Sequence, residues 1–169
     1  MKKILVAALL TTASFGAFAY DAQVNFSGLV LDQTCQINGQ LGQALMNVTL
    51  PTVNKSALTT ASSWAGNTPF KFDLTNCPVS ATSAKWEVTS LVDATADGTL
   101  KNSVAGTNAT LRLLDPIGTP ININTDLGYA FTPAADGSYT LNYTAQYFSK
   151  AGAATAGQLK TVGYMTLTY

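Results

Sequence analysis

The last thirteen residues, 157–169, constrain the fold of this chain more than any other segment. Side chains on a β-strand point alternately to opposite faces of the sheet. One face of this segment would carry Leu159, Thr161, Gly163, Met165, Leu167 and Tyr169. A second alternating segment lies near the other end of the chain, at 21–34. The sequence therefore predicts a β-protein with a strand at each extreme end, and each of these strands could pair with another chain.

The N-terminus has the features of a secretory signal peptide. Lys2 and Lys3 form the charged start, and residues 4–10 form the apolar run. Residues 17–19, Ala-Phe-Ala, give the small-x-small pattern that precedes a cleavage site. We predict cleavage after Ala19. An uncleaved membrane anchor is the weaker alternative, because the apolar run is well short of the roughly 20 residues that a spanning helix needs.

The chain that would remain after cleavage has the length of one domain with a proper core. Without Lys2 and Lys3, the nine basic side chains of the sequence become seven against nine acidic ones, a net charge of −2. Nucleic-acid binding needs a basic patch, so this balance disfavours it. Charged residues make up only 11% of the sequence, which fits extensive burial, including burial between subunits.

The two cysteines, Cys35 and Cys77, are expected to form a disulfide. An even number of cysteines in an exported chain favours pairing, and two cysteines allow only one connectivity. Closing a loop of this length would stabilise the fold by about 4 kcal/mol in the chain-entropy picture. Two buried free thiols are a weaker alternative. A metal site is weaker still, because the chain has no histidine and no closely spaced cysteine pair.

Short alternating segments separated by turn residues predict an all-β sandwich. Strands are expected at 21–34, 45–53, 70–77, 85–92, 110–114, 139–148 and 157–169. Turns are expected at 97–98, 115–118 and 136–137, and loops at 54–68 and 151–157. The loop at 54–68 has room for a short helix. No segment shows helical periodicity over ten or more residues, so helices are not expected to build the core.

The side chains needed for catalysis are scarce. Without histidine, neither a Ser-His-Asp nor a Cys-His arrangement can form within the chain. Glu87 is the only glutamate, and the aspartates are scattered at turns. We therefore expect no catalytic residue, no metal site and no cofactor. Trp64, in a predicted polar loop, is the one aromatic considered as a ligand contact, whereas Tyr143, Tyr147 and Tyr164 are expected in the core or an interface.

Five segments occur in a fixed order along nearly the whole chain after residue 19. They are Val24-Asn-Phe-Ser-Gly28 with Cys35 seven residues later, then 69–77, 111–118, 143–148, and Gly157 with Tyr169 twelve residues on. With the signal peptide and the two cysteines, this set resembles the pilin subunits of bacterial fimbriae assembled by the chaperone-usher route. It is most similar to the type 1 fimbrial major subunit family.

The resemblance implies an immunoglobulin-like β-sandwich that is incomplete, because it lacks its final strand. Such a sandwich is completed by donor-strand exchange, a known form of β-strand addition. A strand of a periplasmic chaperone first fills the open groove, and the N-terminal extension of the next subunit then replaces it. The implied organisation is a signal peptide at 1–19, a donor-strand extension at 20–33 and a pilin domain at 34–169.

The resemblance also assigns roles to two sets of residues. The strand donated to a neighbouring subunit would insert Ala22, Val24, Phe26, Gly28 and Val30. The chaperone-facing groove edge would include Gly157, Met165, Leu167 and Tyr169. From the residues alone, Gly28 could instead mark a bulge, and the terminal segment could be a plain edge strand of the core. Tyr169 is the last residue, whereas the family usually has an aromatic residue in the penultimate position.

The function implied is that of a structural subunit of a surface fimbria that polymerises and supports cell adhesion. Its partners would be a periplasmic chaperone, an outer-membrane usher and identical or related pilin subunits, with no nucleic acid and no small-molecule cofactor. The protein would pass through the periplasm to the cell surface. The alternatives are a minor, adaptor or tip-associated subunit that binds a host receptor and, less favoured, a secreted enzyme.

Overall fold

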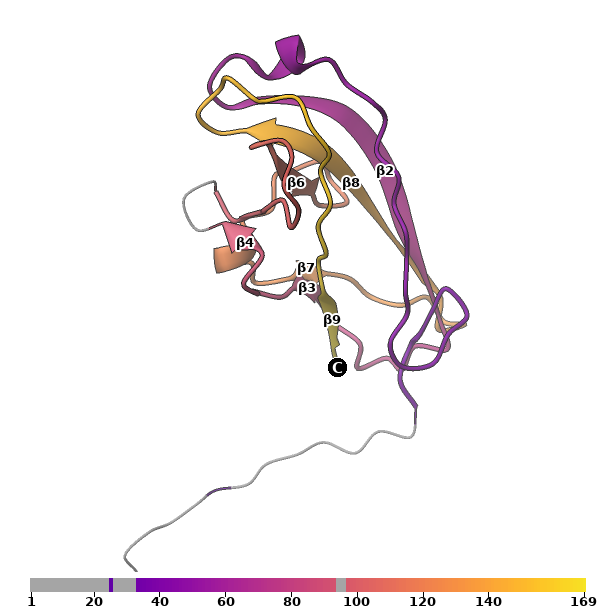
Figure 1. Ribbon diagram of the computed structural model, residues 1–169. Helices are drawn as coiled ribbons and strands as arrows, with labels where there is room; N and C mark the ends of the chain where they lie inside the picture. The colour runs from indigo at the N-terminus through magenta and orange to yellow at the C-terminus, as the bar shows by residue number, and fades with distance from the viewer. Residues whose placement is uncertain (1–24, 26–32, 94–96) are drawn as a thin grey trace, which may run out of the picture. The chain divides into compact units, whose positions relative to one another are not determined.

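The computed structural model describes residue 25 and residues 33–93 and 97–169 (Figure 1). The chain divides after Val30 into two units, and every element below lies in the second, Leu31–Tyr169. The predicted signal peptide lies outside the described residues. So do the predicted donor residues, Ala22, Val24, Phe26, Gly28 and Val30.

Two antiparallel sheets make up the described part of the chain, which confirms the predicted all-β fold. One sheet has six strands in the order β1-β2-β8-β6-β5-β4, and the other has three in the order β7-β3-β9. The strands are β1 (Gln36–Ile37), β2 (Ser63–Thr75), β3 (Ser83–Trp86), β4 (Val92–Asp93), β5 (Thr99–Leu100), β6 (Thr110–Leu114), β7 (Tyr129–Ala130), β8 (Tyr139–Ser149) and β9 (Met165–Thr168). Two short 3-10 helices, η1 (Lys55–Leu58) and η2 (Ile123–Thr125), complete the elements described.

The longest ladder joins β2 to β8 and carries one wall of the core. Phe70 pairs with Tyr143 and Phe72 with Leu141, so the predicted alternation at 70–77 and at 139–148 is confirmed. The strand predicted at 110–114 is also present, as β6. However, β2 begins at Ser63, within the predicted loop 54–68, because its first residues pair with the end of β8. Trp64 therefore lies on a strand, and the prediction that it lies in a loop was wrong.

An aromatic cluster joins the two sheets. Trp86 of β3 meets Tyr143 of β8 edge to face, with ring centroids 5.5 Å apart. Phe70 and Phe72 of β2 each lie 6.3 Å from the Trp86 ring. Edge-to-face contacts of this kind add to the stabilisation from buried area. The placement of Tyr143 in the core agrees with the sequence prediction.

Three predicted strands are shorter or absent. Segment 45–53 is not a strand, because no described strand pairs with its backbone. The strand predicted at 85–92 stops at Trp86, since a turn in which the Val92 N–H donates to the Thr89 carbonyl carries the chain to the other sheet. The strand predicted at 157–169 is reduced to β9, the part that pairs with β3.

The predicted disulfide is present. Cys35 and Cys77 are bonded with an S–S distance of 2.04 Å. Cys35 immediately precedes β1 and Cys77 follows β2, and these two strands pair with each other. The disulfide thus fixes the edge of the six-stranded sheet to its longest strand. None of the helices in the described ranges has the length and apolar character needed to cross a membrane.

The hydroxyl of Tyr143 gives a test of this core. Tyr143 is 2% exposed, and its hydroxyl, which lies near the Trp86 side chain, makes no hydrogen bond of good geometry to any described residue. Replacing it in Tyr143→Phe should raise the free energy of unfolding by about 1 kcal/mol, because an unsatisfied buried group is removed. The measurement is the urea midpoint at unchanged slope. Tyr147→Phe, at a half-buried position, is the control and should leave the midpoint in place. A lower midpoint for Tyr143→Phe would show that the hydroxyl is paired.

Candidate functional site

The outer edge of β9 is open. β9 is the last strand of its sheet and pairs only with β3. On the β3 side, the carbonyl of Tyr164 accepts from Glu87 N–H at 2.8 Å, and that of Thr168 accepts from Thr82 N–H at 2.8 Å. Backbone groups of successive strand residues face opposite sides. The N–H and C=O groups of Met165 and Leu167 therefore face away from β3, where no described strand pairs with them.

The inward face of the terminal segment is apolar and only half-buried. Met165, Leu167 and Tyr169 pack against the core cluster without being fully covered, while Thr166 and Thr168 between them are exposed. The alternation of burial continues back to Leu159, so the predicted face is confirmed even where the backbone forms no strand. The same residues thus offer both apolar side chains and unpaired backbone groups.

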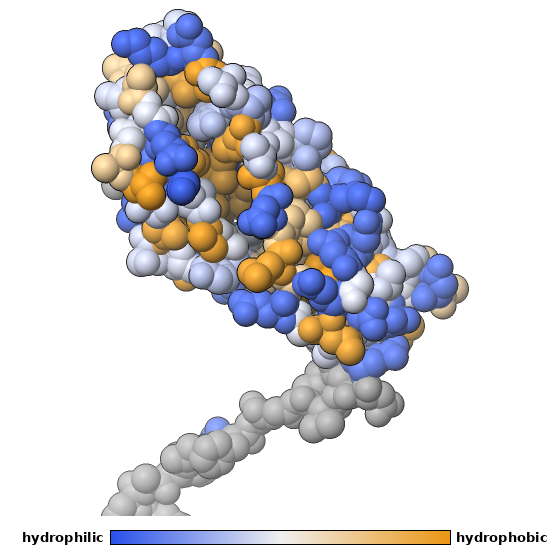
Figure 2. All heavy atoms as spheres, turned by 45° about the vertical axis from the view of Figure 1, so that its right-hand side comes forward, coloured by the Kyte–Doolittle hydropathy of each residue, from blue (hydrophilic) through white to orange (hydrophobic). Residues whose placement is uncertain are grey.

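The core is incompletely covered on the side of β2 and β9. Phe70 and Phe72 point inward from β2 but remain half-buried, whereas Leu141, beside them on β8, is 0% exposed. Segment 45–53 runs along β2 (Figure 1), and its Leu50 packs against the core while its Leu45 is 86% exposed. Figure 2 shows hydrophobic residues inside a hollow on the face turned toward the viewer.

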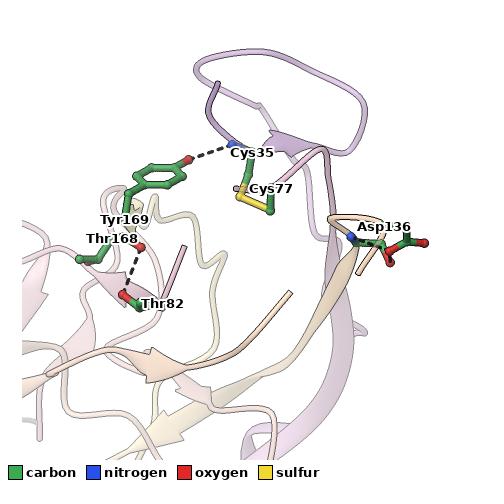
Figure 3. Close-up of a disulfide and its surroundings, with 7 residues drawn as sticks. Cys35, Cys77, Thr82, Asp136, Thr168 and Tyr169 are labelled. Atoms are coloured by element: carbon green, nitrogen blue, oxygen red, sulfur yellow. Dashed lines mark hydrogen bonds between the residues drawn. A yellow bond between two sulfur atoms is a disulfide. The ribbon is translucent and has the colours of Figure 1, made fainter. Parts of the chain in front are cut away.

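Tyr169 connects the two sheets at one end of this edge. The Cys35 N–H donates to the Tyr169 hydroxyl at 3.1 Å, and Cys35 is held in turn by its disulfide to Cys77 (Figure 3). Thr82 binds the neighbouring Thr168 through its N–H and its hydroxyl. The alternating pattern placed the Tyr169 ring correctly, but no feature of the sequence indicated the bond from its hydroxyl to Cys35.

Gly157 lies at the other end of the terminal segment, apart from the three residues with which it was grouped. Its φ is +153°, and a Cβ there would lie 2.6 Å from the backbone of Gly106 and Thr107. Only glycine permits this approach of two backbones. The structure therefore brings Met165, Leu167 and Tyr169 together and places Gly157 where the segment begins.

Among the described residues, no aspartate, glutamate, lysine or arginine is fully buried. Burial raises the pKa of the Tyr143 hydroxyl, and the nearby Asp126 carboxylate raises it further, so this phenol stays neutral at physiological pH. Burial likewise raises the pKa of Tyr139. Within the described ranges, no group of three or more acidic or cysteine side chains is placed to hold a metal ion.

Trp64 belongs to a separate surface cluster. Its ring lies 5.0 Å from the Arg112 guanidinium, which also stands 4.5 Å from the Phe148 ring. Arg112 donates through Nε and Nη2 to the side-chain oxygen of the buried Gln146. Trp64 thus covers part of the β2-β8-β6 surface, and its 56% exposure keeps it accessible to a partner.

An open strand edge beside an uncovered apolar core has a specific chemical use. It can accept an added β-strand, whose backbone would pair with Met165 and Leu167 and whose alternate side chains would fill the hollow. Main-chain hydrogen bonds would supply affinity, and the match of alternating side chains would supply specificity.

Comparison with known proteins points to one group. No family model matches the chain. The chain is 36% identical over 171 residues to the major fimbrial subunit SMF-1 of Stenotrophomonas maltophilia, covering 95% of this chain and 99% of that protein. It is 29% identical over 185 residues to the F17 fimbrial protein of Escherichia coli, covering 100% and 99%. It is 29% identical over 180 residues to the minor fimbrial subunit HifD of Haemophilus influenzae, covering 97% and 81%.

Two solved structures share the fold. A type I fimbria protein and antigen of Burkholderia pseudomallei matches with a TM-score of 0.61 and 29% identity, covering 82% of this chain and 91% of that one. The P pilus rod subunit PapA matches with a TM-score of 0.60 and 22% identity, covering 81% and 99%. The two-sheet sandwich is therefore one that solved fimbrial proteins also adopt.

Tyr169→Phe tests the connection at the end of the open edge. The ring would keep its packing but lose the 3.1 Å bond from Cys35 N–H. The free energy of unfolding should fall by about 1 kcal/mol, and hydrogen exchange at the Cys35 amide should accelerate. Tyr164→Phe is the matched control, because Tyr164 is 49% exposed on the outward face. Equal behaviour of the two variants would contradict a role for the Tyr169 hydroxyl.

Proposed function

The chain belongs to the family of chaperone-usher fimbrial subunits, and we propose that it is the main structural subunit of a surface fimbria that supports cell adhesion. The observation that carries this proposal is the open edge of β9 beside an uncovered apolar core. A subunit built in this way is unfinished as a monomer, and polymerisation supplies what it lacks. The subunit would assemble by strand exchange, which needs neither a cofactor nor catalytic turnover.

In this proposal, the sandwich lacks its final strand, and segment 20–33 of a neighbouring subunit provides it. Ala22, Val24, Phe26, Gly28 and Val30 would enter the hollow beside Met165 and Leu167. Burial of each Val or Phe side chain contributes roughly 1.5–3 kcal/mol. Several such insertions, together with new backbone hydrogen bonds, favour a slowly dissociating contact after the cost of association is subtracted. The support is the match between an alternating segment and an edge that can accept one.

Before assembly, a periplasmic chaperone would cover the same edge at Met165, Leu167 and Tyr169, with Gly157 at its beginning. An unpaired edge beside exposed apolar side chains is prone to uncontrolled association, so it needs a temporary partner. An outer-membrane usher would then exchange the chaperone strand for that of the next subunit. Export would follow cleavage after Ala19 and end in a cell-surface fimbrium.

A minor or adaptor subunit is the second candidate. The similarity to the minor fimbrial subunit HifD supports it. The two roles differ in whether one copy donates its extension to another copy. An adaptor would join unlike subunits and would not form long homopolymers.

The deciding experiment isolates the protein from the periplasm, with and without its chaperone, and examines heat- and detergent-resistant ladders on a gel. Long ladders are expected for a self-polymerising subunit. An adaptor would give at most a heterodimer. Electron microscopy of cells that lack only this chain supplies the second readout, and normally fimbriated cells would contradict the role of main subunit.

Gly28→Leu tests the donor segment. The family resemblance implies that the groove is shallow where Gly28 inserts, so a leucine side chain should block insertion there. Ladders should then shorten or vanish while the chaperone-bound subunit accumulates normally. Val24→Leu, which keeps an apolar side chain at a bulky position, is the control and should still form ladders. Equal loss of folding and polymerisation in Gly28→Leu would refute the assignment.

A further inference from the structure

The terminal segment keeps its alternating register well beyond the end of β9. Leu159, Thr161, Gly163, Met165 and Leu167 are all half-buried, and the residues between them are exposed. Only Met165–Thr168 is assigned as strand, since β3 ends at Trp86. Something other than a neighbouring strand must therefore hold the earlier part of the segment.

The side chain of Asn102 provides this hold. Its Nδ2 donates to the carbonyl of Gln158 at 2.7 Å, and its Oδ1 accepts from Lys160 N–H at 2.9 Å. The same Nδ2 donates to the carbonyl of Thr107 at 3.0 Å, which fixes the amide to its own loop. The side-chain amide of Asn102 thus donates one hydrogen bond to Gln158 and accepts one from Lys160, two positions further along the chain. A paired strand makes the same kind of contact through its peptide groups.

Ser103 strengthens the same contact. Its N–H and its hydroxyl both donate to the carbonyl of Lys160, at 2.7 and 2.8 Å. The Thr107 N–H donates to the Gln158 carbonyl at 3.3 Å, next to the close approach of Gly106 to Gly157. The loop before β6 therefore engages Gln158 and Lys160 and leaves their neighbour Leu159 directed the other way.

The register of these contacts agrees with that of β9. Gln158 and Lys160 turn their backbone groups toward Asn102, while Tyr164 and Thr168 turn theirs toward β3 and the residues that flank it. All four are even-numbered positions. By the alternation of a strand, the backbone of Leu159 then faces the same open side as that of Met165 and Leu167.

We propose that Asn102 is a positioning residue that lengthens the strand-accepting edge from β9 back to Leu159. The proposal rests on the proposed function, because the partner is an incoming β-strand with alternating apolar side chains. With Asn102 in place, one end of that strand pairs with the region of Leu159 and the other with Met165 and Leu167. Without it, only the β9 end remains ordered for pairing.

The experiment uses the mature chain, residues 20–169, and three fluorescent peptides: 20–33, 24–33 and 20–29 of this sequence. Binding is followed by anisotropy at a protein concentration below that at which ladders form. In the wild-type chain, each truncation should weaken binding about tenfold, the equivalent of one or two net backbone hydrogen bonds. In Asn102→Ala, peptide 20–33 should bind about tenfold more weakly, and one of the two truncations should have no further effect.

Asn108→Ala is the matched control. Asn108 also binds backbone through its side chain, since its Oδ1 accepts from Thr155 N–H at 2.8 Å, but it holds the loop before the edge. In this variant both truncations should keep their full effect. A purely structural role for Asn102 would weaken all three peptides by the same factor, and that result would overturn the inference.

Ser103→Ala guards against a variant that does not fold. It removes only the hydroxyl donor to the Lys160 carbonyl and leaves the backbone donor in place. In Ser103→Ala, one of the two truncations should weaken peptide binding by less than it does in the wild-type chain. If both truncations weaken binding as strongly as in the wild-type chain, the inference is contradicted. If the wild-type chain binds none of the peptides, the proposed function itself fails, a result distinct from a failure seen only in the variants.

Discussion

The one-sided pairing of β9 is the constraint on which the rest of this structure depends. Backbone N–H and C=O groups that lie beside an apolar core need partners, and Met165 and Leu167 have none on their outer side within the described residues. Water can bind the outer backbone groups of Met165 and Leu167 only while the hollow beside them stays open. An open hollow in turn leaves Phe70 and Phe72 only half-buried. An added strand resolves both problems at once, because one segment supplies backbone partners and apolar side chains together.

The aromatic cluster explains how the two sheets stay together while this edge is open. Trp86 meets Tyr143 across the interior, and both are nearly fully buried. Phe70 and Phe72 form the boundary between this closed part of the core and the open side. The disulfide acts at the same boundary, since it ties Cys35, next to the open end, to Cys77 at the end of β2. The disulfide and the aromatic contacts thus hold the two sheets together beside the open side of the core.

The strands that depend on local sequence pattern could be predicted, whereas features that depend on contacts between distant segments could not. The strands at 70–75, 110–114 and 139–148 could be predicted from local sequence pattern, and each finds a neighbour in its own sheet. Segment 45–53 has the composition of a strand but is not one, since a strand also needs a second backbone to pair with. The inward face at Met165, Leu167 and Tyr169 could be predicted, whereas the bond from the Tyr169 hydroxyl to Cys35 joins residues too distant in sequence to leave a pattern.

Side chains help to hold the open edge at both of its ends. Tyr169 is fixed through its hydroxyl to Cys35, and Lys160 and Gln158 are fixed through Asn102. A side chain holds a backbone from one side only, so it sets the register without occupying the outer edge. In the proposed assembly, holding the edge in this way would let the short strand β9 present a longer surface to an incoming segment.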